Sequence, residues 1–340
     1  MKKNRIKRWM LPLLTGAFFL QAFLMTSCEK WNEAEAKDFY APHTEAYKRN
    51  LKEYFKSPHK VMFGWFGNWA GKGGSMQYAL MGLPDSVDFV SLWLQLGKLT
   101  PAQQEDLREF QARGSRAVYC FTSNEIGKFA TPEGVENVAE FWGYADGKEE
   151  SYIKAARKYA LAIADSCEKY NVDGFDIDME LTGTLINFSH PERLDTFMMT
   201  LREEFDKKGR LLVADIPAGW NDYYQIFTPK VLRKLDYIIW QSYDIGNSHL
   251  RLDDMFLALK QYFPGEKGLW EEVVRKSIVT ATFERAADKP KFKGLQTYHP
   301  AFGIEHAGIG AYHIEYDYPG NPDYPYVREG IASLNPPIKK

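Results

Sequence analysis

The chain has 340 residues, of which 45% are hydrophobic and 26% are charged, a balance typical of a folded globular protein. Its formal net charge is −2, and removal of the five basic residues within residues 2–8 would leave 38 basic against 45 acidic side chains, a net charge of about −7. This balance excludes the basic face that nucleic acid binding requires, so we expect no nucleic acid partner and no polybasic membrane contact.

Residues 1–27 have the features of an export signal. Residues 2–8 carry basic side chains and no acid, and the apolar run 10–25 is shorter than the roughly 20 residues that a membrane span needs. Small residues then precede Cys28, an arrangement that resembles a bacterial lipoprotein cleavage site. We predict a mature chain that begins at Cys28, carries lipid there and is anchored to the bacterial envelope, at the cell surface or in the periplasm. A plain secretory peptide followed by a chance cysteine is the alternative.

Residues 28–55 are polar and helix-prone, and we interpret them as a tether that leads into a capping helix. From residue 56 to residue 340 we expect a single domain in which short apolar runs alternate with helical stretches, the pattern of a parallel sheet with crossover helices. The eight strand candidates are Lys60–Trp65, Val87–Leu94, Ala117–Thr122, Gly174–Glu180, Leu211–Ile216, Tyr237–Tyr243, Ile278–Phe283 and Ile309–Ile314.

Eight parallel strands that are apolar on both faces favour an α/β fold of the (β/α)8 barrel type, also called a TIM barrel. Amphipathic patterns predict helices at 151–170 and 191–208. An open, doubly wound sheet is the rival fold, but residues 71–74 lack the glycine spacing of a nucleotide-binding loop. Cys120 lies in a strand pattern and Cys167 in a helix pattern, so we expect two buried apolar residues and no structural disulfide.

An acidic motif occupies the fourth predicted strand, with Asp173, Asp176, Asp178 and Glu180 in the run 173–180. Side chains alternate between the two faces of a strand, so the last three acids share one face, which in a barrel is the interior. Glu180 lies at the carboxyl end, where the active sites of such barrels are built.

Acids spaced about 6.7 Å apart on one buried face cannot all ionise cheaply, because each carboxylate raises the pKa of the next. We therefore expect proton sharing and at least one neutral carboxyl group near pH 7, which is the state that a general acid needs. The alternatives are a solvated strand end or a cation site. No histidine lies within the motif, and we predict no metal.

A second polar pair, Gln241 and Tyr243, ends the sixth predicted strand. Alternation places both side chains on one face of that strand. An amphipathic strand with a hydrogen-bonded tyrosine is the purely structural alternative.

Together these residues resemble glycoside hydrolase family 18, whose signature D-x-x-D-x-D-x-E lies on the fourth barrel strand and is matched at all four positions. The resemblance extends over roughly residues 56–320. In this family a tyrosine at the place of Tyr243 binds the acetamido group of the substrate. Gln241 with Tyr243 is similar to the Gln-x-Tyr of endo-β-N-acetylglucosaminidases, whereas chitinases usually carry Met-x-Tyr. Residues 121–124 lack the Ser-x-Gly-Gly common in chitinases, and Tyr312 stands where their last strand often ends in tryptophan.

The resemblance implies a substrate that contains N-acetylglucosamine, no cofactor, and cleavage in which the substrate's own acetamido group is the nucleophile. Glu180 would be the proton donor, Asp178 would orient the acetamido group, and Asp176 would tune the charge of Asp178. Tyr243 and Gln241 would hold the acetamido group.

Asp173, Trp69, Trp93 and Tyr312 are our further candidates for substrate contact, although each aromatic residue can instead belong to the core. Weaker candidates for the cleft are Trp65, Asn68, Asp215 and Glu284. The expected enzyme is a monomer that cuts the β-1,4 bond between N-acetylglucosamine residues, as in the chitobiose core of N-glycans. A chitinase and a non-catalytic, glycan-binding surface lipoprotein are the alternatives.

Overall fold

The computed structural model describes residues 43–219, 221–246 and 248–336, and the fold is described here for the compact unit that starts at Glu45. The export signal and Cys28 lie outside the described residues. None of the helices in the described ranges combines the length and apolar character needed to cross a bilayer.

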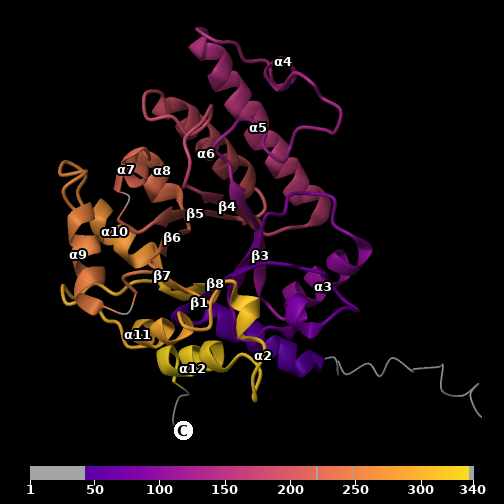
Figure 1. The fold of residues 1–340 in the computed structure, drawn as a ribbon, viewed down its shortest axis with the longest axis vertical. Helices are drawn as coiled ribbons and strands as arrows, with labels where there is room; N and C mark the ends of the chain where they lie inside the picture. The colour runs from indigo at the N-terminus through magenta and orange to yellow at the C-terminus, as the bar shows by residue number, and fades with distance from the viewer. Residues whose placement is uncertain (1–42, 220, 247, 337–340) are drawn as a thin grey trace, which may run out of the picture. The chain divides into compact units, whose positions relative to one another are not determined.

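Eight parallel strands form a closed barrel, shown in Figure 1. Each strand pairs with the next in the chain, and β1 also pairs with β8, which confirms the (β/α)8 barrel and excludes an open sheet. The strands are β1 (Val61–Phe66), β2 (Phe89–Trp93), β3 (Arg116–Thr122), β4 (Gly174–Asp178), β5 (Leu211–Pro217), β6 (Tyr237–Gln241), β7 (Ser277–Thr282) and β8 (Gly308–Tyr312).

Helices surround the barrel and connect its strands (Figure 1). The α-helices are α2 (Glu45–Lys56), α3 (Pro101–Ala112), α4 (Val138–Trp142), α5 (Glu149–Tyr170), α6 (Pro191–Asp206), α7 (Asn221–Gln225), α8 (Pro229–Lys234), α9 (His249–Leu259), α10 (Leu269–Lys276), α11 (Phe292–Gln296) and α12 (Pro325–Leu334). Four 3-10 turns complete the connections: η1 (Met76–Tyr78), η2 (Leu80–Gly82), η3 (Lys289–Lys291) and η4 (Ile314–Asp317). The two helices predicted from amphipathic patterns correspond to α5 and α6.

Helix ends follow local sequence signals. Thr100 caps α3 through a capping box with Gln103, and a proline follows it in the first turn. Asn171 ends α5 in the left-handed conformation, with φ of 53°, which asparagine tolerates better than most residues.

Three predicted strands, the fourth, the sixth and the eighth, extend two residues past the observed strands at their carboxyl ends. Glu180 and Tyr243 lie two residues beyond the ends of β4 and β6, because the ladder runs out there. Asp178 is the last paired residue of β4, and Gln241, which pairs with Pro217, is the last paired residue of β6. Glu180 and Tyr243 therefore sit in loops at the carboxyl ends of the strands.

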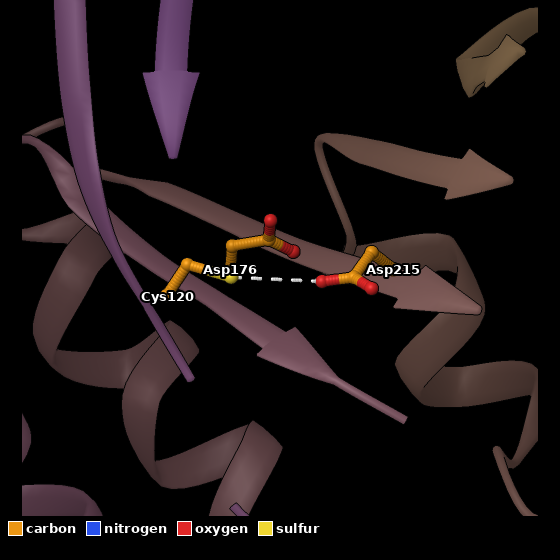
Figure 2. Close-up of side chains that lie close together, drawn as sticks. All are labelled: Cys120, Asp176 and Asp215. Atoms are coloured by element: carbon orange, nitrogen blue, oxygen red, sulfur yellow. Dashed lines mark hydrogen bonds between the residues drawn. The ribbon is translucent and has the colours of Figure 1, made fainter. Parts of the chain in front are cut away.

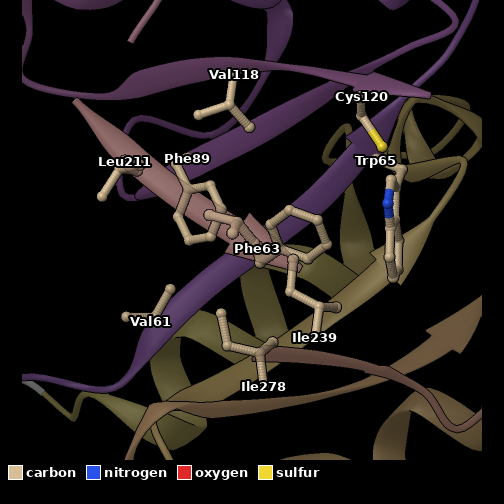
Figure 3. Packing of buried hydrophobic residues seen from close by; sticks show 10 residues of the cluster. Val61, Phe63, Trp65, Phe89, Val118, Cys120, Leu211, Ile239 and Ile278 are labelled. Atoms are coloured by element: carbon tan, nitrogen blue, oxygen red, sulfur yellow. The ribbon is translucent and has the colours of Figure 1, made fainter. Parts of the chain in front are cut away.

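The barrel interior is apolar toward the amino ends of the strands. Figure 3 shows its packed core, formed by Val61, Phe63, Trp65, Phe89, Val118, Cys120, Leu211, Val213, Ile239 and Ile278. Phe89 stacks on Tyr237 with ring centroids 5.0 Å apart, and the ring of Phe63 packs against both Phe89 and Trp65. Polar interior residues follow nearer the carboxyl ends of the strands. The interior is therefore filled by apolar side chains toward the amino ends and by a layer of polar side chains toward the carboxyl ends.

Cys120 and Cys167 are both buried and both free. Cys120 belongs to the barrel core, whereas the Cys167 thiol lies 3.4 Å from the carbonyl oxygen of Gly174 beneath α5. They therefore have the separate, buried environments that the sequence predicts for them.

Helix α2 contacts the segment that enters β1. The Tyr54 ring lies 4.3 Å from the His59 ring, and Asn335 donates a hydrogen bond of 3.2 Å to the Tyr54 hydroxyl. The side-chain oxygen of Asn335 also accepts a bond of 2.8 Å from the amide of Lys60. The helix is thus attached at the amino end of the barrel, while the domain boundaries at residues 27 and 55 stay predictions.

Candidate active site

The acid row on β4 faces the interior of the barrel. Asp176 and Asp178 are completely buried, whereas Phe175 packs outward against Phe197 of α6. The Ser91 hydroxyl on β2 donates a hydrogen bond of 2.6 Å to Oδ2 of Asp176. The Thr122 hydroxyl on β3 donates one of 2.8 Å to Oδ2 of Asp178. The alternation expected for β4 therefore holds residue by residue.

A third buried acid, Asp215 on β5, joins this row. Asp215 is paired in register with Asp178 and has no exposed surface. The side-chain amide Nε2 of Gln241 lies 2.6 Å from Oδ1 of Asp215 and 3.5 Å from Oδ1 of Asp178. In the sequence Asp215 is only a weak candidate, but an aspartate inside the apolar strand Leu211–Pro217 is itself an unusual signal.

The electrostatics of this cluster favour protonated acids. Burial raises the pKa of Asp176 to about 7, and burial together with the charge of Glu180 raises that of Asp178 to about 7. Burial and the charges of Asp178 and Asp176 raise the pKa of Asp215 well above its usual value. The three groups cannot all be ionised near neutral pH, so a proton is shared among them. The motif predicts such sharing for its own acids, and Asp215, which lies outside the motif, is an additional member.

Glu180 lies at the mouth of the barrel. Its side chain is partly exposed, and its backbone oxygen accepts a hydrogen bond of 2.7 Å from the hydroxyl of Tyr223. Its charge contributes to the raised pKa values of Asp178 and Tyr243, so its carboxylate lies on the side of the acid row and not among the outer helices. A partly exposed acid above a buried acid row can exchange protons with a bound molecule.

Aromatic side chains surround the same space. Trp65, at the end of β1, is only 2% exposed and packs edge-on against Tyr243 at 6.3 Å and Tyr312 at 6.2 Å. Tyr243 and Tyr312 stack with centroids 5.9 Å apart and planes 25° apart. Trp93 contacts Tyr312 edge-on at 5.9 Å. Trp65 thus packs on the buried side of Tyr243 and Tyr312. Trp93, Tyr243 and Tyr312 keep partly exposed surface on which the apolar face of a sugar ring can pack.

Two predicted substrate contacts need correction. Trp69 is buried with 6% exposure, and its indole N–H donates a hydrogen bond of 2.7 Å to Asp106 of α3. Asp173 precedes β4 at the amino end of the barrel, where its carboxylate accepts bonds of 2.8 Å from the Ala117 amide and 2.9 Å from Gln111. Both residues serve the scaffold, Trp69 against the outer helix and Asp173 at the end of the barrel opposite Glu180.

The weaker polar candidates lie at the rim. Glu284 is exposed after β7, and its charge helps to raise the pKa of Tyr312 after the larger effect of burial. Asn68 is exposed after β1, and its side-chain amide lies 3.4 Å from the hydroxyl of Tyr316.

The sequence analysis missed an ordered cluster that follows β8. His313 has φ of 53° and pairs through Nδ1 with the buried Glu315 at 2.7 Å. The His313 ring stacks on Tyr316 with planes 5° apart and lies 4.2 Å from Tyr312. The contacts within the run from Tyr312 to Tyr316 therefore fix the position of Tyr312 at the mouth. The high density of aromatic and charged residues in this run was the sequence signal that could have indicated such a cluster.

Loops after β3 and β4 form one side of the mouth. Glu125 accepts hydrogen bonds from the backbone amide and the hydroxyl of Thr184, at 3.0 and 2.7 Å. The Asn124 carbonyl accepts a bond of 2.8 Å from Leu185. These bonds join the two loops, so the chain that carries Glu180 is fixed to the neighbouring loop.

The side chains of Cys120, Asp176 and Asp215 lie close together (Figure 2). The Cys120 sulfur and one carboxylate oxygen of each aspartate lie within 4.8 Å of one another. Three such groups could bind a metal ion, but Gln241 directs an N–H at Asp215 and Ser91 directs an O–H at Asp176. Donors aimed at these two carboxyl groups stabilise their anionic or shared-proton forms and compete with a cation for their lone pairs. The geometry therefore suits proton storage better than metal binding.

Comparison with family models places residues 32–333 in the family described as "Glycoside hydrolase family 18, BT1044-like". The chain is 33% identical to a solved selenomethionine variant of BT1044, with a TM-score of 0.73 and coverage of 86% of this chain and 94% of that chain. A search of the curated proteins gives no match.

Two more distant solved structures share the fold. An endo-β-N-acetylglucosaminidase from Cordyceps militaris is 19% identical, with a TM-score of 0.62 and coverage of 87% of this chain and 98% of that chain. A family 18 chitinase from Pseudoalteromonas aurantia is 14% identical, with a TM-score of 0.54 and coverage of 81% and 100%.

Proposed function

Because the chain belongs to glycoside hydrolase family 18, we propose that it cleaves the β-1,4 bond between two N-acetylglucosamine residues, as in the chitobiose core of N-glycans. The observation that carries the proposal is the arrangement of Asp178 and Glu180 beside Gln241 and Tyr243, above the indole of Trp65. This arrangement joins a proton donor, an acetamido-binding group and an aromatic surface in one space.

The proposed reaction begins with Glu180. Its carboxyl proton passes to the glycosidic oxygen as the bond from that oxygen to the anomeric carbon breaks. The carbonyl oxygen of the substrate's own 2-acetamido group bonds to the anomeric carbon and forms an oxazolinium ion. Asp178, as a carboxylate, accepts the acetamido N–H and stabilises the positive charge, while Tyr243 and Gln241 hold the group in place.

The second half of the reaction regenerates the enzyme. Glu180, now a carboxylate, takes a proton from water while the water oxygen attacks the anomeric carbon and opens the oxazoline ring. Two inversions at one carbon give net retention of configuration. No metal or organic cofactor enters these steps.

Gln241 supports the proposed endo-β-N-acetylglucosaminidase activity over the alternative, a chitinase. Its amide is held by two acids, so the Gln-x-Tyr pair is built into the site and is not a surface substitution. Tyr312 supports the same choice, because it takes the strand-eight position that is often tryptophan in chitinases and is fixed against Trp65 and Trp93.

The deciding experiment compares defined substrates. Purified protein is incubated with a high-mannose glycopeptide, a complex-type glycopeptide and a chitin oligomer, and the products are identified by mass spectrometry. We expect release of the glycan with a single N-acetylglucosamine left on the peptide. Preferred cleavage of the chitin oligomer would instead assign a chitinase, and binding without cleavage of any substrate would assign a glycan-binding protein.

Two substitutions and one modified substrate test the mechanism. Glu180→Gln should lower the rate by about 10²- to 10⁴-fold, because it removes the general acid. Glu53→Gln removes an exposed carboxylate on α2, at the amino end of the barrel, and should leave the rate unchanged within a few-fold. A substrate whose reacting sugar lacks the N-acetyl group should not be cleaved, since it has no internal nucleophile.

We further propose that the mature enzyme is a monomer held at the envelope by lipid on Cys28. Support comes from the sequence around Cys28 and from the presence of every proposed catalytic group in one chain. Labelling of cells with a fatty acid should mark the wild-type chain and leave a Cys28→Ser variant unlabelled. Equal labelling of both chains would remove the lipoprotein assignment without affecting the catalytic one.

A further inference from the structure

Asp215 makes contacts that the reaction above does not use. It lies on β5 with no exposed surface, beside Asp178 in register and 2.6 Å from the amide of Gln241. We propose that Asp215 is the proton-holding residue of the acid cluster, a positioning residue whose neutral carboxyl group keeps Asp178 anionic and fixes the amide of Gln241. The inference deepens the proposed function and rests on it.

The first argument is an unsatisfied acceptor. Oδ1 of Asp176 is buried without a hydrogen-bond partner, while Oδ2 accepts the hydroxyl of Ser91. Asp215 uses Oδ1 to accept from Gln241, which leaves its Oδ2 facing Cys120 at 3.7 Å, within the cluster that includes Asp176 (Figure 2). A proton on Oδ2 of Asp215 gives the cluster the O–H donor that a buried carboxylate oxygen requires.

The second argument is the distribution of donors. Asp176 and Asp178 each accept a short hydrogen bond from a hydroxyl group, of Ser91 and Thr122, and such bonds favour the ionised form. Asp215 accepts one amide hydrogen bond at Oδ1, and the only other donor directed at it within the described ranges is the Cys120 thiol, which is a weak donor. The proton therefore costs least on Asp215.

The third argument is the charge that surrounds Asp215. The titratable groups facing it are Cys120 from β3, Asp176, Asp178 and Glu180 from β4 and its loop, and Tyr243 from the loop after β6. All of them are neutral or negative. In the described ranges no lysine, arginine or histidine forms an ion pair with the three buried aspartates. Each negative neighbour favours the neutral form of Asp215.

A neutral Asp215 has a defined consequence for the substrate. Since Nε2 of Gln241 is directed at Asp215 and Asp178, its carbonyl Oε1 is the atom left to accept a hydrogen bond from the substrate side. Asp215 therefore sets which atoms of the Gln241 amide face the substrate, while the single acetamido N–H stays assigned to Asp178. Asp178 can then carry the negative charge next to the oxazolinium ion.

The test combines infrared spectroscopy with substitutions. The carbonyl stretch of a buried, protonated carboxylic acid is separate from that of a carboxylate. Wild-type protein should show it at about pH 8.5, which is above the pKa of about 7 of Asp176 and Asp178, so that Asp215 is the member of the cluster that stays protonated. The band should be absent from Asp215→Asn and present in Asp176→Asn. Absence of the band from wild type, or its loss in Asp176→Asn with retention in Asp215→Asn, would overturn the proposal.

Kinetics supply an independent readout. Asparagine is a neutral isostere that keeps an acceptor for Gln241 and a donor for the acids, so Asp215→Asn should lose no more than about tenfold in kcat/KM, whereas Asp215→Ala should lose about 10- to 100-fold beyond that. Equal, severe losses in both folded variants would mean that the ionised carboxylate is required. The infrared result does not depend on any substrate, so it separates failure of this inference from failure of the proposed function.

Discussion

The hydroxyl of Ser91 donates a hydrogen bond of 2.6 Å to Oδ2 of Asp176, and both side chains are completely buried inside the barrel. It is the short hydrogen bond to Oδ2, whereas Oδ1 accepts none from the described residues apart from the proton that we propose on Asp215. The interaction crosses from β2 to β4, so it holds the deepest acid of the site in place.

Ser91→Ala should lower the free energy of unfolding by about 1–3 kcal/mol, because it leaves a buried carboxyl group without its donor. The loss should be larger at pH 8 than at pH 5, since a hydrogen bond to a carboxylate is about twice as strong as one to a neutral acid. Denaturant unfolding at both pH values measures the effect. Ser123→Ala is the matched control: Ser123 is a buried serine with a bond of 3.4 Å to a backbone oxygen, and its loss should not depend on pH. A pH-independent loss in Ser91→Ala would contradict an ionisable partner.

The raised pKa values of Asp176 and Asp178 predict the pH dependence of stability. Their folded-state pKa values of about 7 exceed the usual value of 3.8, so the folded state binds more protons than the unfolded state between about pH 4 and 7. The stability they contribute is fully present below pH 4 and is lost as the pH rises through 7, by at most about 1.4 kcal/mol per pH unit for each proton.

Asp176→Asn removes one of these titrations. Relative to wild type, its melting temperature should therefore rise more at pH 8 than at pH 5, in scans that compare the two proteins at each pH. A constant difference between the proteins would mean that Asp176 is ionised throughout this range.

The position of the acid row was predictable from the sequence, because a strand has a side-chain period of two and a parallel barrel buries one face. The same rule could have placed Asp173 correctly. Asp173 precedes the first residue of β4, so it belongs to the amino end of the barrel. Its match to the family motif indicated importance but not contact with a substrate.

The proximity of Asp215 to Asp178 was not predictable in this way. It depends on the register between β4 and β5, which arises from barrel closure and not from either strand alone. The direction of the Trp69 side chain was also not predictable from the sequence. Asn68 has φ of 53°, and this local turn comes before Trp69, whose indole bonds to α3. Composition cannot distinguish Trp69 from Trp65, four residues earlier, which faces the interior.

Tyr243→Phe should lower kcat/KM by about 10- to 100-fold. The substitution removes the hydroxyl group that we propose binds the charged intermediate, and the loss of a hydrogen bond to a charged group costs about 1.5–3 kcal/mol. Tyr237→Phe is the matched control, since Tyr237 lies on the same strand face but stacks on Phe89 in the apolar core. Initial rates on the preferred glycopeptide measure both variants. Equal losses in the two variants would show that the effect of Tyr243→Phe comes from packing and not from contact with the substrate.

Trp93 and Trp69 give opposite predictions that separate a sugar contact from a scaffold contact. Trp93→Ala removes a partly exposed wall next to Tyr312 and should raise KM about 2- to 12-fold, the equivalent of an aromatic contact worth 0.5–1.5 kcal/mol. Trp69→Phe removes the N–H donor to the buried Asp106 and should lower the free energy of unfolding by about 1–3 kcal/mol with KM unchanged. Steady-state kinetics and denaturant unfolding on both variants provide the comparison. An indole that is bonded only to α3 can affect substrate binding only through the stability of the loop that carries it. A change in KM for Trp69→Phe without loss of stability would therefore show that Trp69 contacts the substrate.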